Sequence, residues 1–211
     1  PATYAIRVHG VEVARGDAPR GKLLAVGPNI DQLPGADTRD PAFGGRAKWI
    51  AADLSHQAAV VGVTVVDRSA VVTTHLAEVV REHAGSLLSR QDTKVLLDVV
   101  KTSNPVLLEE MTAAGLTLGD IQGVLRGLLD EGVPVRDLVR IVEAVTEQAR
   151  TPQKDADCLL EAARITLGST IGSLYSPLGT LPAITLAPPL EHTLISSIQS
   201  GDRGRTLAIS A

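Results

Sequence analysis

The spacing of apolar residues changes twice along this chain, and each change predicts a different kind of secondary structure. Near the N-terminus Tyr4, Ile6 and Val8 alternate with polar residues, which is the period of a half-buried β-strand. From residue 85 to residue 167 the apolar residues instead recur at helical spacing. After Ser169 short apolar runs return. The sequence therefore predicts an α+β chain with several subdomains, in which an all-helical subdomain lies between mixed α/β regions.

The first mixed region is divided by a long segment rich in glycine and proline. Between residues 27 and 45 the chain has four glycines and three prolines, a composition that favours turns. Residues 63–67 form a β-branched run that predicts a strand, and Asp67 can cap a helix starting at Arg68. We therefore predict one α/β subdomain from residues 1–18 and 68–87, incomplete at its N-terminus, with residues 19–67 inserted as a small α/β second subdomain.

The helix that starts at Arg68 carries an apolar stripe, which should pack against the N-terminal strands. We expect Ile6 and Val8 to lie near Val72 and Val79 in a shared core. The full set of apolar positions expected on the buried side of this helix is Val71, Val72, Leu76, Val79 and Val80.

Residues 88–167 predict a third subdomain made of about five helices joined by short turns. Ser89 with Asp92 resembles a capping box, and Thr117 starts a further amphipathic helix. Leu125 and Ile141 fall on the apolar stripes of successive helices, so we expect them to be buried against each other's helices.

The last region, residues 168–211, is predicted to be a truncated fourth α/β subdomain. The pattern of apolar and polar residues predicts a strand over 180–187, a helix over 189–199, a loop over 201–205 and a strand over 206–210.

Charge and motif content argue against an enzyme, a metalloprotein or a nucleic-acid reader. The 20 basic and 24 acidic residues are spread along the chain, so no basic surface is expected. The histidines are scattered, Cys158 is the only cysteine, and no metal-binding motif is present. His75 follows two threonines, yet no acidic residue or nucleophile elbow accompanies it, so a plain helix-face position is favoured. We expect no catalytic residue, metal or cofactor.

The only phenylalanine and the only tryptophan fall in one short stretch, R-D-P-A-F-G-G-R-A-K-W-I-A-A-D-L, in a chain with 2% aromatic residues. Phe43 is either an exposed contact residue held on a turn or a core residue. Trp49 is expected where a helix over 52–62 begins, and we expect it to anchor the core of the second subdomain.

Several motifs in a fixed order resemble the cytoplasmic region of the FHIPEP family, the export-gate proteins of flagellar and virulence type III secretion. These motifs are D-P-A-F-G, W-I, G-V-T-V-V-D, T-H-L, L-L-S-R-Q and V-L-R-G-L-L-D-E-G-V-P-V-R-D-L. The resemblance implies a membrane-spanning N-terminal half, absent from this chain, and a cytoplasmic half of four subdomains. It also implies a ring of nine copies at the cytoplasmic face of the bacterial inner membrane.

The resemblance implies a docking platform without an active site. Its partners would be flagellar export chaperones with bound substrates, and other export-apparatus proteins. The chaperone site in this family is an apolar dimple between the first two subdomains, and the motif matches assign to it Asp40, Phe43 and Thr74, with Val66 and Val71 as lining. Where the family usually continues F-G-L-P-A, this chain has Arg46 and Lys48, which we expect to add charge beside the dimple.

The alternatives are a virulence-type export-gate homologue and, from another functional class, a cytosolic enzyme or regulator with a similar layout. On the docking reading, the isolated chain is expected to be soluble and monomeric, because the membrane half would gather the subunits. Ring contacts are then expected to use exposed charges on the 81–90 and 136–150 helices.

Overall fold

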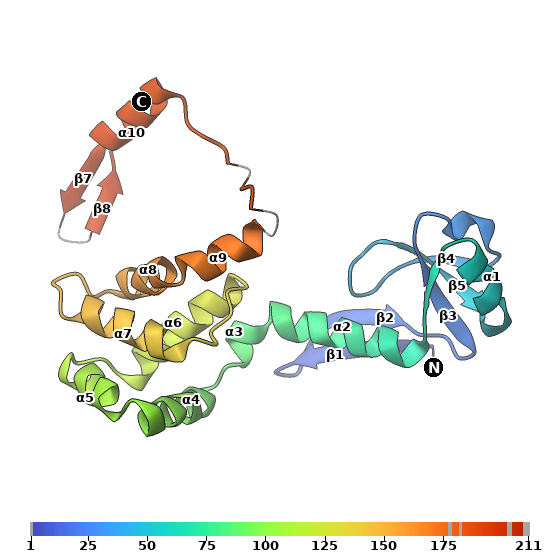
Figure 1. Ribbon diagram of the computed structural model, residues 1–211, viewed down its shortest axis with the longest axis horizontal. Coiled ribbons are helices and arrows are strands. Elements are labelled where there is room, and N and C mark those ends of the chain that lie inside the picture. Colours follow the sequence, from blue (N-terminus) through green and yellow to red (C-terminus); the bar gives the residue numbers. More distant parts are fainter. Residues whose placement is uncertain (1, 177–178, 182, 202–203, 209–211) are drawn as a thin grey trace. The chain divides into compact units, whose positions relative to one another are not determined.

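The computed structural model describes residues 2–176, 179–181, 183–201 and 204–208, and it confirms the α+β class (Figure 1). The chain forms two compact units, Pro1–Ile171 and Gly172–Ala211. The four predicted subdomain boundaries stay a prediction.

The N-terminal strands form a two-stranded antiparallel hairpin. Strand β1 (Thr3–Val8) pairs with β2 (Val11–Asp17), and the register places Tyr4 opposite Gly16. His9 and Gly10 both have positive φ, which is the geometry of a tight hairpin turn whose twist matches that of the strands.

The region after residue 18 forms a four-stranded antiparallel sheet in the order β4-β5-β3-β6. Its strands are β3 (Lys22–Val26), β4 (Ala36–Arg39), β5 (Arg46–Ala51) and β6 (Thr64–Val66). One face of the sheet packs Ala25 and Ile50 against Ile30, Leu33 and Ala58. Ile30 lies in the short helix η1 (Ile30–Gln32), and Ala58 lies in α1 (Ser55–Val60).

The predicted position of Trp49 at the start of a helix is wrong. Trp49 lies within β5, and the helix that follows is shorter than expected, a 3-10 turn η2 (Ala52–Leu54) leading into α1. Because side chains alternate along a strand, Trp49 and Ala47 face the opposite side of the sheet from Ile50. There they pack with Leu24 and with Val71 of the helix that follows the sheet.

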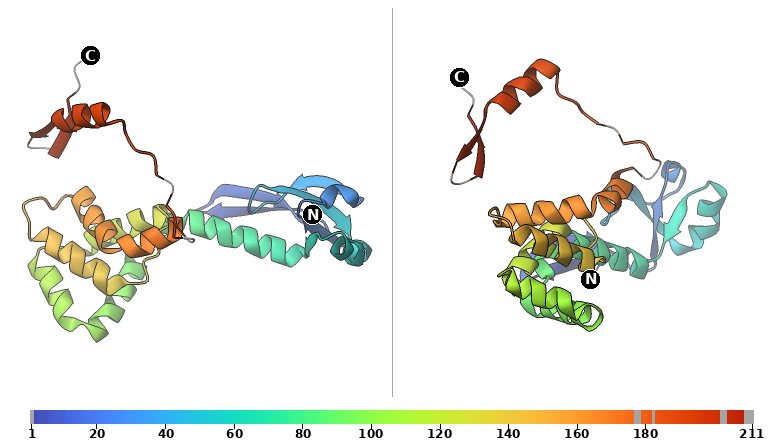
Figure 2. Two further views of the ribbon diagram at one scale, coloured as in Figure 1. Left: turned by 45° about the horizontal axis from the view of Figure 1, so that its top comes forward. Right: turned by 60° about the vertical axis from the view of Figure 1, so that its left-hand side comes forward.

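That helix, α2 (Arg68–Glu82), begins at Asp67 as predicted, since the Asp67 carboxylate accepts hydrogen bonds from the backbone N–H groups of Ser69 and Ala70. Figure 2 shows α2 running alongside β1 and β2. Its buried positions are Val71, His75 and Val79. The apolar stripe expected on α2 is therefore partly wrong, because Leu76 and Val80 are exposed and a histidine occupies the centre of the buried face.

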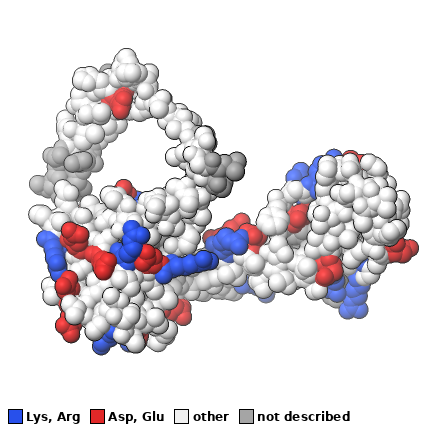
Figure 3. Space-filling model, viewed as in Figure 1, with Lys and Arg blue, Asp and Glu red and all other residues white. Residues whose placement is uncertain are grey.

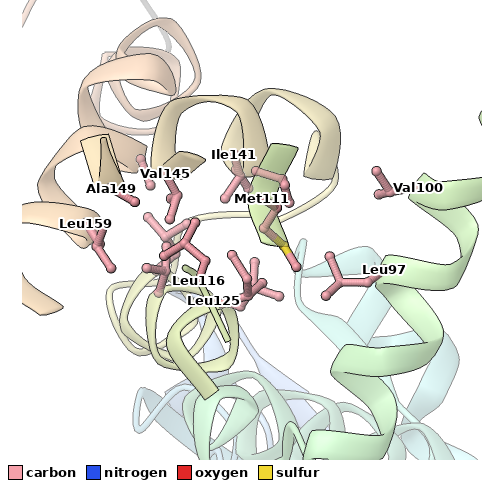
Figure 4. Close-up of a cluster of buried hydrophobic side chains, with 14 of the residues drawn as sticks. Leu97, Val100, Met111, Leu116, Leu125, Ile141, Val145, Ala149 and Leu159 are labelled. Atoms are coloured by element: carbon pink, nitrogen blue, oxygen red, sulfur yellow. The ribbon is translucent and has the colours of Figure 1, made fainter. Parts of the chain in front are cut away.

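The all-helical part follows α3 (Ala84–Leu87). Both predicted helix starts at Ser89 and Thr117 are capping boxes, completed by Asp92 and Asp120. The helices are α4 (Arg90–Ser103), α5 (Pro105–Ala113), α6 (Leu118–Asp130), α7 (Leu138–Ala149), α8 (Ala156–Thr166) and α9 (Gly168–Tyr175). Leu125 of α6 and Ile141 of α7 are fully buried in one cluster (Figure 4), which confirms their predicted burial. The two helices each pack more closely on α8 than on each other, so the predicted packing of α6 on α7 is not confirmed.

The strand predicted over 180–187 is absent among its described residues, which have no regular secondary structure. No described strand pairs with them, and an extended segment without a partner gains no ladder hydrogen bonds. Helix α10 (Pro188–Ser196) ends earlier than predicted, because Ile198 starts a hairpin of β7 (Ile198–Gly201) and β8 (Gly204–Leu207). Part of the predicted loop and part of the predicted last strand, at 202–203 and 209–210, lie outside the described residues.

The capping carboxylates predict how stability depends on pH. Hydrogen bonds from the Ser89 and Thr117 side chains lower the pKa values of Asp92 and Asp120 below their ordinary values. A carboxyl whose pKa is lower in the folded state stabilises the fold above its unfolded pKa of about 3.9, and this contribution is lost as pH falls through the folded pKa. The midpoint temperature of thermal unfolding should therefore decrease as the pH is lowered below about 4.

The double variant Asp92→Asn with Asp120→Asn is expected to start from a lower midpoint at pH 7 and to show a smaller fall on acidification, measured by circular dichroism. If the midpoint of the double variant fell on acidification as steeply as that of the wild type, the two capping carboxylates would not be the cause of the pH dependence of stability.

Candidate functional site

The site predicted from the sequence begins at the loop that joins β4 to β5. The Asp40 carboxylate accepts hydrogen bonds from the backbone N–H groups of Ala42 at 2.9 Å and Phe43 at 3.4 Å. The Asp40 carbonyl accepts a further bond from the N–H of Gly44 at 2.8 Å. Gly44 has a φ of 70°, in the left-handed region that glycine adopts without strain. The loop is therefore a hydrogen-bonded turn, in which Asp40 holds the backbone that carries Phe43.

Phe43 is exposed, whereas Trp49 is buried. The Phe43 side chain keeps 68% of its surface accessible, compared with 6% for Trp49. Of the two positions that the sequence left open, the structure therefore shows the exposed one, and a contact between Phe43 and a partner stays a prediction. A large ring on a stable turn offers apolar contact area at a low cost in conformational entropy.

The other predicted site residues lie on β6 and α2. Val71 is buried in the cluster with Leu24, Ala47 and Trp49, and Val66 packs against the same cluster from its edge. Thr74 is half-buried, one turn further along α2. The structure thus brings Val66 and Val71 to one cluster, in which Val71 is buried and Val66 half-buried. Phe43 stands on the loop between β4 and β5 and belongs to none of the described core clusters.

Arg46 and Lys48 do not lie on the side of the sheet that faces α2. They alternate with Ala47 and Trp49 along β5, so their side chains project from the opposite face. The Arg46 guanidinium pairs with Asp31 at 2.9 Å, and the buried Lys48 ammonium donates to the Leu33 carbonyl at 3.2 Å. The charge that the sequence led us to expect beside the apolar cluster is therefore directed to the other face.

Sequence reasoning missed a polar contact between the N-terminal hairpin and α2. His75, for which the sequence favoured a plain helix-face position, is 6% exposed, and its Nδ1 lies 2.8 Å from the Tyr4 hydroxyl. Burial, followed by the nearby carboxylates of Asp40 and Asp17, raises the pKa of Tyr4. One signal was available, because His75 lies four residues from both Val71 and Val79 and so shares their helix face.

On the face that Figure 3 shows, basic and acidic side chains are interspersed over the helical part and do not form a patch of one sign there. Within the described ranges, His, Cys, Asp and Glu side chains do not gather in groups suited to a metal ion. No helix among the described residues is long and apolar enough to cross a membrane.

Comparison with known proteins shows to which family the sequence of this chain is similar. A sequence profile of the FHIPEP family matches residues 1–211. The chain belongs to the FHIPEP family. The flagellar biosynthesis protein FlhA of Escherichia coli (strain K12) is 41% identical over 204 residues, which cover 95% of this chain and 29% of that protein. The FHIPEP chain described here thus spans less than a third of this relative's length.

Solved structures share the fold of this FHIPEP chain. The CdsV protein of Chlamydia pneumoniae matches with a TM-score of 0.82 at 23% identity, covering 100% of this chain and 61% of that one. The nonameric EscV cytosolic domain from the type III secretion system matches with a TM-score of 0.67 at 21% identity, covering 99% and 63%. At this identity the likeness establishes the common fold.

Proposed function

We propose that this chain is the cytoplasmic docking part of a flagellar protein-export gate, and that it receives export chaperones with their bound substrates. The observation that carries the proposal is the exposed Phe43 on a turn held by Asp40. The full-length protein would present this region on the cytoplasmic face of the inner membrane. Binding at this site needs no catalytic group.

The arrangement suits a partner with an apolar anchor of its own. Phe43 supplies the exposed contact, and Thr74 supplies a half-buried hydroxyl on α2. Burying a mostly exposed aromatic side chain is worth about 1.5–3 kcal/mol, which is enough for one residue to dominate a small interface. A flagellar role is favoured over a virulence role because the flagellar relative is 41% identical, whereas the type III secretion structure is 21% identical.

Ring assembly is the second part of the proposal, and the nonameric EscV domain supports it by analogy of fold. The arginines expected to serve ring contacts also act within the chain. Arg140 of α7 donates to the Thr166 carbonyl at 2.7 Å, and Arg150 pairs with Glu110 of α5 at 2.9 Å. Substituting either one would therefore change packing between helices as well as any contact between subunits.

The proposal is tested by titrating the purified chain with a flagellar export chaperone bound to its filament-type substrate. Isothermal calorimetry should show saturable binding, and the chaperone without substrate serves as the comparison. Absence of heat and of complex formation with every flagellar chaperone–substrate pair tried would remove the docking function.

The role of Asp40 gives a specific prediction. Asp40→Ala removes the acceptor for two backbone N–H groups, so the turn should lose its fixed shape and binding should weaken by about three- to tenfold. Asp40→Asn keeps a side-chain oxygen in the same place and should retain most of the affinity. If both variants bind as the wild type does, the turn is not part of the site.

A further inference from the structure

Tyr4 and His75 make a directional contact between two elements that are 71 residues apart in sequence. The Tyr4 hydroxyl donates to His75 Nδ1 at 2.8 Å when the imidazole carries its proton on Nε2. The two rings also pack edge to face, with centroids 5.6 Å apart and planes at 73°. This geometry combines an aromatic contact with a hydrogen bond, and both depend on how the ring of Tyr4 is placed.

A glycine on the neighbouring strand leaves room for this placement. Gly16 lies directly opposite Tyr4 in the β1–β2 register. A Cβ atom at Gly16 would lie 2.5 Å from the Tyr4 hydroxyl oxygen and 2.6 Å from the ring carbon that bears it. The Tyr4 side chain therefore crosses the backbone of β2 at Gly16 to reach His75. Any larger residue at position 16 would push the ring away from α2.

The contact fixes the orientation of α2 together with a second, apolar contact. Val71 packs on the sheet cluster around Trp49, and His75 follows one turn later on the same helix face. Valine packing tolerates small rotations and slides, whereas the hydrogen bond from the half-buried Tyr4 to the buried His75 constrains direction. Two consecutive turns of α2 are thus held by different elements, the first by the four-stranded sheet and the second by β1. Thr74 lies in sequence between Val71 and His75, at the edge of the buried face.

We propose that Tyr4, His75 and Gly16 form a positioning element that fixes the rotation of α2, and with it the presentation of Thr74. These residues do not touch the partner, and they act through α2. This inference rests on the proposed docking function for its effect on affinity, but its structural part concerns α2 alone.

The experiment compares Tyr4→Phe with Tyr175→Phe, since Tyr175 is the only other tyrosine and is 62% exposed. Each substitution removes one hydroxyl. Hydrogen–deuterium exchange is measured over 70–76, and affinity is measured for the flagellar chaperone–substrate complex. Tyr4→Phe should speed exchange in this segment and weaken binding by about two- to tenfold, while Tyr175→Phe should change neither.

Variants at His75 separate positioning from loss of volume. His75→Leu fills the space but cannot accept the hydrogen bond, so it should behave like Tyr4→Phe. His75→Asn can place its side-chain oxygen near the position of Nδ1, so it should restore slow exchange and most of the affinity. Gly16→Ala should match Tyr4→Phe, because it displaces the same ring.

Wild-type exchange in Tyr4→Phe and His75→Leu would overturn the positioning element. Faster exchange with unchanged affinity would overturn its role in presenting Thr74. If the wild-type chain binds no chaperone–substrate complex, the proposed function fails, and the exchange data by themselves still decide whether Tyr4 fixes α2.

Discussion

Replacing Leu125 by alanine should lower the free energy of unfolding by about 2–5 kcal/mol. Leu125 is 0% exposed and lies in the helical core with Ile141, Leu97 and Met111 (Figure 4). The substitution removes buried methyl groups and leaves a cavity that tightly packed helices fill only in part. Urea denaturation followed by circular dichroism measures the loss.

Leu76→Ala is the matched control, because the same atoms are removed from a helix position that is exposed. It should change the unfolding free energy by about 0.5 kcal/mol or less. Equal losses in the two variants would contradict the burial of Leu125 in the helical core.

Replacing Phe43 by alanine should weaken binding of a chaperone–substrate complex at least tenfold, while the thermal midpoint stays nearly unchanged. The ring is exposed, so its removal opens no cavity, yet it takes away the largest apolar contact of the loop. A buried phenylalanine would instead cost about 3–5 kcal/mol of stability. Calorimetric titration and a thermal melt of the same sample measure both effects.

Val60→Ala provides the control for Phe43, because Val60 is another exposed apolar residue, on the helix α1 that packs against the same sheet. It should leave both affinity and midpoint as in the wild type. A Phe43→Ala variant that melts several degrees lower and still binds would assign the ring to the core and not to a partner.

Local signals in the sequence were sufficient for most of the helical part. Ser89 with Asp92 and Thr117 with Asp120 satisfy the first free N–H groups of their helices, and this chemistry depends only on residues a few positions apart. The alternation of Tyr4, Ile6 and Val8 likewise predicted β1. The exposure of Phe43 could not be settled locally, because turn composition does not say which side chains a distant element covers.

The errors arose where distant segments decide the structure. Trp49 is in a strand because β3 and β4 flank it, and no periodicity in its own neighbourhood shows those partners. His75 lies on the buried face of α2, where Tyr4 of β1 forms a hydrogen bond with it. Leu76, the apolar residue expected on that face, is exposed. The described part of 180–187 lacks a pairing strand, although its composition favours β-structure.

Hydrogen–deuterium exchange of the wild-type chain with and without a saturating chaperone–substrate complex tests the docking site most directly. We expect slower exchange on binding in the loop at 40–45 and in the first turns of α2 at 70–76, with the helices between 90 and 149 unchanged. Protection confined to those helices, with the loop exchanging as it does in the free chain, would contradict the site.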